Sequence, residues 1–212
     1  MNRSRFNNRG LALMLTVLLA VPAMSAADQG QEPKVEVVDV EGAATLGPED
    51  APATLVIFAD LRAITAGGLG VILQGLVGRY PSTLRVCFRH APAADQPDHV
   101  LAHRAVIAAG AQGKFWEMLD LLLANRARQG SDDLPAMAAQ LALDTKKFSE
   151  DLDSATAHQR IAADRQQAAA LKLVANPTFF VNGVRLSGPK SLTELAAQID
   201  AAIARTRGGL AR

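Results

Sequence analysis

The sequence contains a single cysteine, Cys87, among its 212 residues. One thiol cannot form an intrachain disulfide, so the stability of the fold has to come from packing. Aromatic residues make up only 4% of the chain, which leaves few rigid side chains to anchor a strong interface. The net charge is +1, with no run of basic residues, and therefore indicates neither nucleic acid nor an acidic membrane surface as a partner.

Long apolar runs are also missing, except near the start of the chain. Three arginines precede the apolar run 11–23, and small residues follow at 25–27. This order is typical of a secretory signal peptide, and the run is shorter than the roughly 20 residues of a membrane-spanning helix. We predict a signal peptide over residues 1–27 and a mature chain, periplasmic or secreted, that does not contact the membrane after cleavage. An uncleaved anchor is the alternative.

After this segment, the hydrophobic pattern predicts alternating strands and helices. Residues 28–46 begin as a polar linker, and the alternation over 34–40 predicts a short edge strand. Residues 53–60 and 82–92 are apolar runs typical of strands buried on both faces. Between them, residues 67–81 have the spacing of a helix that ends at proline. A strand, a helix and a strand joined by short connections predict a parallel pair.

The remainder of the chain is helical and then returns to strand. Helical periodicity runs through residues 96–173 without a fixed repeat. The sequence "NPTFFVNGVRLSG", residues 176–188, then predicts a β-hairpin that turns at Asn182–Gly183. An amphipathic helix closes the chain. These elements together indicate an α/β protein.

Five stretches carry a resemblance to a known family over nearly the whole mature chain. They are "GPEDAPATLVIFAD", "GRYP", "LRVCFRHAP", "GKFWEMLDLLLANR" and "NPTFFVNGVRLSG". With them the chain resembles the DsbA family of periplasmic thiol-disulfide oxidoreductases. The resemblance implies a thioredoxin-like core over residues 47–95 and 174–212, with an inserted helical domain over 96–173. It also implies that Pro177 is a cis-proline facing a Cys-x-x-Cys turn.

The chain departs from this family at the turn itself. Residues 57–70 read "IFADLRAITAGGLG", so Ala63 and Ala66 occupy the positions of the two cysteines. In the family, a helix N-terminus stabilises the first thiolate, and the second sulfur resolves the mixed disulfide. Alanine can do neither. The sequence therefore predicts no catalytic residue at this corner and no redox turnover.

Cys87 lies inside a predicted buried strand and is expected to be an inert core residue, since apolar surroundings raise the pKa of a thiol. Two alternatives stay open for this free thiol. It forms a disulfide between two chains, or it supports a residual thiol-disulfide activity.

The function that we predict from these features is binding without redox chemistry. The residue before the family's proline offers its backbone to an extended segment, so Asn176 and Pro177 are candidate binding residues for a peptide or a periplasmic protein partner. No cofactor is expected. One alternative is a glutathione-dependent transferase or isomerase in which Thr65 holds the glutathione thiolate, although an N-cap is the simpler role for Thr65. Another alternative is an accessory subunit.

The remaining polar residues give weaker signals. Asp60 is expected to cap or turn the corner, with a buried proton acceptor as the alternative. His99 and His103 have the i, i+4 spacing of a metal-binding helix, but no partner motif accompanies them, so exposed helix positions are expected and no metal site is predicted. Five glycines within 67–78 indicate a loosened helix.

Overall fold

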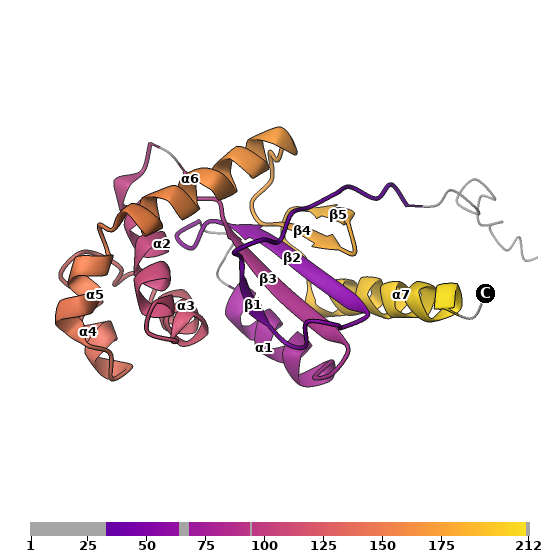
Figure 1. Ribbon diagram of the computed structural model, residues 1–212, viewed down its shortest axis with the longest axis horizontal. Helices are drawn as coiled ribbons and strands as arrows, with labels where there is room; N and C mark the ends of the chain where they lie inside the picture. The colour runs from indigo at the N-terminus through magenta and orange to yellow at the C-terminus, as the bar shows by residue number, and fades with distance from the viewer. Residues whose placement is uncertain (1–32, 64–67, 94, 211–212) are drawn as a thin grey trace, which may run out of the picture. The chain divides into compact units, whose positions relative to one another are not determined.

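A five-stranded sheet organises the structure, a computed structural model that describes residues 33–63, 68–93 and 95–210. Its strands stand in the order β1-β3-β2-β4-β5 (Figure 1). β2 and β3 run parallel, and the other neighbouring strands are antiparallel. The strands are β1 (Ala44–Leu46), β2 (Ala53–Ala59), β3 (Leu84–His90), β4 (Thr178–Val181) and β5 (Val184–Ser187). The parallel pair predicted from the sequence is confirmed.

Seven helices cover the sheet and extend beyond one end of it within the described residues. α1 and α7 lie on one side of the sheet and α6 lies on the other (Figure 1). The helices are α1 (Leu69–Arg79), α2 (Pro97–Gly110), α3 (Phe115–Ala124), α4 (Leu134–Gln140), α5 (Thr145–Asp151), α6 (Ala155–Ala170) and α7 (Leu192–Leu210).

β2 is buried on both faces, as its apolar run predicts. Leu55 and Ile57 point into the larger core, which α1, α2, α3 and α7 complete. Val56 and Phe58 point the opposite way and pack with Cys87, Phe180 and the end of α6. Because successive side chains of β2 point to opposite faces of the sheet, this one strand contributes to both cores.

The helices α2 to α6 all fall between β3 and β4 in the chain, within the range predicted for the inserted helical domain. The residues from Pro33 onward form one compact unit. The boundaries of the core and of the helical domain stay a prediction.

The predicted strand over residues 34–40 is wrong. This segment forms only one isolated bridge, between Val35 and Val184, and the strand in this part of the chain is β1. β1 pairs with β3 at one edge of the sheet, whereas Val35 lies against β5 at the other edge. Val38 and Val40 instead pack against the smaller core, so burial of their side chains explains the alternation that indicated a strand.

The predicted hairpin turn joins β4 to β5. Asn182 and Gly183 both have positive φ, +46° and +82°, as the two central residues of a type I′ hairpin turn require. The Asn182 side chain also accepts a hydrogen bond from the Thr54 backbone N–H (2.7 Å) and donates one to the Pro52 carbonyl (2.9 Å). The turn is thereby tied to the start of β2.

Candidate functional site

The end of β2 carries a buried carboxylate, Asp60, which is only 2% exposed. Its oxygens accept hydrogen bonds from the backbone N–H groups of Arg62 and Ala93, each at 3.0 Å, and lie 2.6 Å from His99 Nδ1. Burial raises the pKa of this carboxyl, but the neighbouring His103 and His99 and the two backbone donors lower it more. The net effect holds the pKa of Asp60 well below its usual range, so the group stays ionised.

Two fully enclosed histidines lie next to this carboxylate. His103, on α2, has no solvent exposure, and its Nδ1 lies 2.8 Å from Nδ1 of His90 at the end of β3. The expectation that His99 and His103 are exposed is wrong for His103, and His99 keeps only 23% of its side chain exposed. The reason is tertiary, because α2 packs this face against the ends of β2 and β3.

The hydrogen bonds fix which ring nitrogen carries each proton. The Leu61 backbone N–H donates to Nε2 of His103 at 3.1 Å, so that nitrogen is unprotonated. His103 therefore carries its proton on Nδ1 and donates it to Nδ1 of His90, which leaves the His90 proton on Nε2. Burial lowers the pKa of both imidazoles, which favours these neutral forms.

The Asn176–Pro177 loop lies directly beside the end of β2. The Asn176 side-chain oxygen accepts a hydrogen bond from the Asp60 backbone N–H at 3.0 Å, and its amide nitrogen lies 3.4 Å from the Ala91 carbonyl. The peptide bond between Asn176 and Pro177 is cis. The structure thus brings together two candidate positions that are more than a hundred residues apart, and it uses the Asn176 amide to hold them there.

The corner that follows β2 is described only as far as Ala63. Its carbonyl accepts a hydrogen bond from Nη2 of Arg126 at 2.6 Å, and the Arg62 carbonyl accepts a second at 3.2 Å. Ala66 and Thr65 lie outside the described residues. Ala63 follows Asp60 by three residues, and its N–H donates to the Asp60 carbonyl at 3.3 Å. The roles predicted for Ala63, Ala66 and Thr65 stay predictions.

A cavity of about 310 Å³ opens beside the Pro177 loop. Its lining comes from the end of β2, the segment after β3, α6 and residues 173–176, and is apolar except for Arg165 and Asn176. At its edge the Val174 side chain is 99% exposed. An apolar cavity of this size suits a side chain of a bound segment better than a large ligand.

Cys87 lies within the smaller core and has no solvent exposure. Burial raises the pKa of its thiol, and the charges of Arg85 and Arg89 oppose that rise only in part. A thiol that is both protonated and enclosed is a poor nucleophile and a poor partner for a second chain.

The family model described as "Thioredoxin" matches residues 39–201. The chain belongs to the thioredoxin family. Among solved structures, this thioredoxin-family chain resembles a thioredoxin-like oxidoreductase from Silicibacter pomeroyi, with 25% identity and a TM-score of 0.70, covering 76% of this chain and 91% of the other. It also resembles alpha-DsbA1 of Wolbachia pipientis, with 17% identity and a TM-score of 0.72, covering 82% of this chain and 97% of the other. The fold is therefore the DsbA-like thioredoxin fold, here without a Cys-x-x-Cys motif.

Sequence relatives of this thioredoxin-family chain are named as antiporters. It is 35% identical to the Na(+)/H(+) antiporter NhaA 3 of Salinispora tropica over 93% of its own length, and 37% identical to NhaA 1 of Salinispora arenicola over 76%. The chain spans only 30% and 25% of the lengths of these two relatives. Within the described part of the chain, no helix is both long and apolar enough to cross a membrane.

The cluster of Asp60, His90, His99 and His103 is the feature that the sequence analysis missed. One signal was present, because the carboxyl ends of neighbouring parallel strands meet at the same edge of a sheet, and Asp60 and His90 follow or end two such strands. Among the described residues, no group of three or more His, Cys, Asp and Glu side chains is placed to hold a metal ion.

Proposed function

We propose that this thioredoxin-family protein binds extended polypeptide segments without thiol chemistry, as an exported, chaperone-like module. The observation that carries the proposal is the apolar cavity beside the Asn176–Pro177 loop. A segment lying across this loop pairs its backbone with the loop and places one side chain in the cavity. We propose the periplasm as its location, in line with the predicted signal peptide.

The sulfur content supports a role without redox turnover. Disulfide exchange needs a thiolate that attacks and a second thiol that releases the mixed disulfide. The one cysteine of the chain is enclosed in the core, and alanine stands at both candidate positions, Ala63 and Ala66. Binding of an extended segment needs neither sulfur.

The test uses reduced, carboxymethylated α-lactalbumin, an unfolded protein without thiols, as the probe. We expect saturable binding by fluorescence anisotropy, and we expect Val174→Asp to weaken it about tenfold because a charge at the cavity edge opposes burial of an apolar side chain. Val37→Asp is the matched control, since Val37 is 93% exposed and lies near the opposite end of β4. Equal loss in both variants, or no binding by the wild type, contradicts the proposal.

A second candidate role is that of an accessory domain for a membrane transporter. The observation behind it is that relatives named as Na(+)/H(+) antiporters contain a matching region that makes up about a quarter to a third of their length. Purification of the tagged protein from membranes of its native host tests this role. Recovery of an antiporter at a fixed ratio supports it, and recovery of the protein alone contradicts it.

A further inference from the structure

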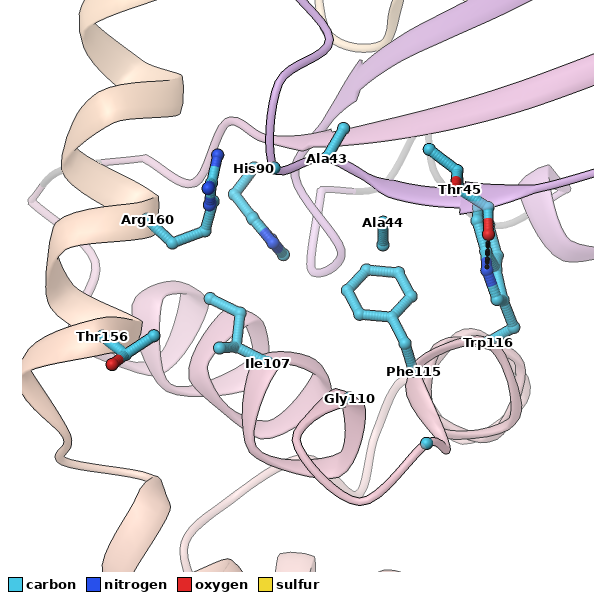
Figure 2. A pocket seen from close by; sticks show the side chains of 12 residues that line it. Ala43, Ala44, Thr45, His90, Ile107, Gly110, Phe115, Trp116, Thr156 and Arg160 are labelled. Atoms are coloured by element: carbon cyan, nitrogen blue, oxygen red, sulfur yellow. Dashed lines mark hydrogen bonds between the residues drawn. The ribbon is translucent and has the colours of Figure 1, made fainter. Parts of the chain in front are cut away.

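A second cavity, of about 440 Å³, lies away from the Pro177 loop, where the segment before β1 meets α2, α3 and α6. Its walls include Ile107 and Phe115, and His90 and Arg160 border the same space (Figure 2). Trp116 also lines it, but the indole N–H is already used, because it donates to the Thr45 carbonyl at 3.0 Å. The cavity therefore has an apolar side and a side that carries nitrogen donors.

His90 supplies the first of these donors. The residue is 2% exposed, and the imidazole points into the cavity in Figure 2. Its Nδ1 is taken by His103, so the proton sits on Nε2, which has no hydrogen-bond partner among the described residues. The imidazole lines the cavity, so an acceptor bound there can take the hydrogen bond of this N–H.

The orientation of this donor is fixed from the backbone. The Leu61 N–H sets the tautomer of His103, and His103 sets that of His90. His90 is therefore a hydrogen-bond donor at Nε2 before any ligand arrives, which is the property that favours a hydrogen-bond acceptor over a donor.

Arg160 supplies the second donor and a positive charge. Its Nη1 donates to the Glu41 carbonyl at 3.1 Å and lies 3.6 Å from Asp164, a carboxylate that is already bonded to Arg89 at 2.7 Å. Its Nη2 lies against Gly42, where a Cβ would come within 1.9 Å of it. Among the described residues, no hydrogen bond uses this Nη2.

We propose that this cavity binds a small organic acid with an apolar body. The carboxylate accepts hydrogen bonds from His90 Nε2 and the Arg160 guanidinium, and the body of the molecule packs on Ile107 and Phe115. A neutral acceptor can also accept hydrogen bonds from His90 and Arg160, but it does not form the ion pair with the Arg160 guanidinium that a carboxylate forms. The residues that line this site differ from those that line the cavity beside the Pro177 loop. A negative result for the organic acid therefore leaves the proposed binding of polypeptide segments unaffected, and the reverse also holds.

The test compares 3-phenylpropionate with its neutral amide, 3-phenylpropanamide, on protein with ¹⁵N-labelled histidine. We expect the spectrum of the protein alone to show neutral His90 protonated at Nε2 and neutral His103 protonated at Nδ1. We expect a saturable shift of the His90 Nε2 signal with the acid, and binding of the amide about tenfold weaker. A different His90 tautomer, or no saturable shift with the acid at millimolar concentration, overturns the proposal.

Two variants with a matched control locate the site. Arg160→Gln is expected to remove the preference for the acid over the amide, whereas Arg128→Gln, which removes an exposed charge elsewhere, is expected to keep it. Ile107→Trp is expected to fill the cavity and abolish binding of both molecules. Unchanged binding in Ile107→Trp, or equal effects of the two arginine variants, places the molecule elsewhere and overturns the proposal.

Discussion

At the scale of single residues, the protein is marked by ionisable side chains enclosed in its core. His90 and His103 are buried and neutral, and Asp60 is buried and charged, because each has a partner suited to that state. The carboxylate accepts from several donors at once, whereas His103 accepts from the Leu61 backbone N–H and donates to His90. The protonation state of each group is therefore set by its hydrogen bonds and burial together.

These histidines predict a loss of stability in mild acid. Burial lowers the pKa of His90 and His103 below the value of 6.5 for a free imidazole, and nearby positive groups lower that of His90 further. Below about pH 6.5, these two imidazoles take up protons in the unfolded chain but not in the folded chain. The free energy of unfolding should therefore fall as the pH drops, by up to about 1.4 kcal/mol per pH unit for each imidazole that stays neutral.

Urea unfolding at about pH 7.5 and about pH 5.5 measures this loss. The depressed pKa of Asp60 acts in a different window, since its stabilisation is lost only as the pH falls below the carboxyl's unfolded value of 3.8. Equal stability at the two pH values would contradict the lowered pKa of the buried imidazoles.

At the scale of elements, α1 shows that the surroundings of the glycines differ within one helix. The helix begins at Leu69, with Gly68 at its N-cap position. A Cβ at Gly75 would lie 2.2 Å from Cδ1 of Leu192, so this glycine permits close packing of α7. A Cβ at Gly78 would meet no atom within 4 Å. Close helix packing therefore accounts for one of these glycines, and nothing in the structure explains the other.

Alanine substitutions separate these two positions. We expect Gly78→Ala to raise the free energy of unfolding by about 0.5 kcal/mol, because alanine loses less backbone entropy in a helix. Gly75→Ala should gain less or destabilise, because its methyl group displaces Leu192. Denaturant unfolding of both variants gives the comparison. A gain at Gly75 as large as that at Gly78 would mean that α7 accommodates the methyl group freely.

At the scale of the whole molecule, a fold shared with thiol-disulfide oxidoreductases is built here without their sulfurs. The Pro177 loop lies beside the end of β2, and two apolar cores hold the parallel strand pair in place. Neither core depends on a disulfide. The fold therefore does not require the thiol-disulfide chemistry for which its structural relatives are named.

Restoring both cysteines tests whether the scaffold still supports that chemistry. We expect Ala63→Cys/Ala66→Cys to form a disulfide and to catalyse insulin reduction in the presence of dithiothreitol, where the wild type gives no turnover. Ala63→Cys alone should trap mixed disulfides without turnover, because no resolving thiol follows. If the double variant forms no disulfide, positions 63 and 66 do not correspond to the family's cysteines.

Much of the fold was predictable because local pattern decides it. The apolar runs of β2 and β3, the Asn182–Gly183 turn and the helical periodicity of the middle segment each follow from side-chain spacing and backbone preference. The strand predicted over 34–40 was wrong because alternation reports burial of one face and does not show whether the backbone pairs with a neighbouring strand.

The sequence by itself determined that this protein has no dithiol, since two alanines and one cysteine can be read directly from it. Only the tertiary structure decided what the histidines do. His103 meets His90 and the carboxylate of Asp60 because α2 crosses the ends of two strands, and no local spacing encodes that contact. Chemistry that depends on which residues are present is readable from the chain, whereas chemistry that depends on long-range packing is not.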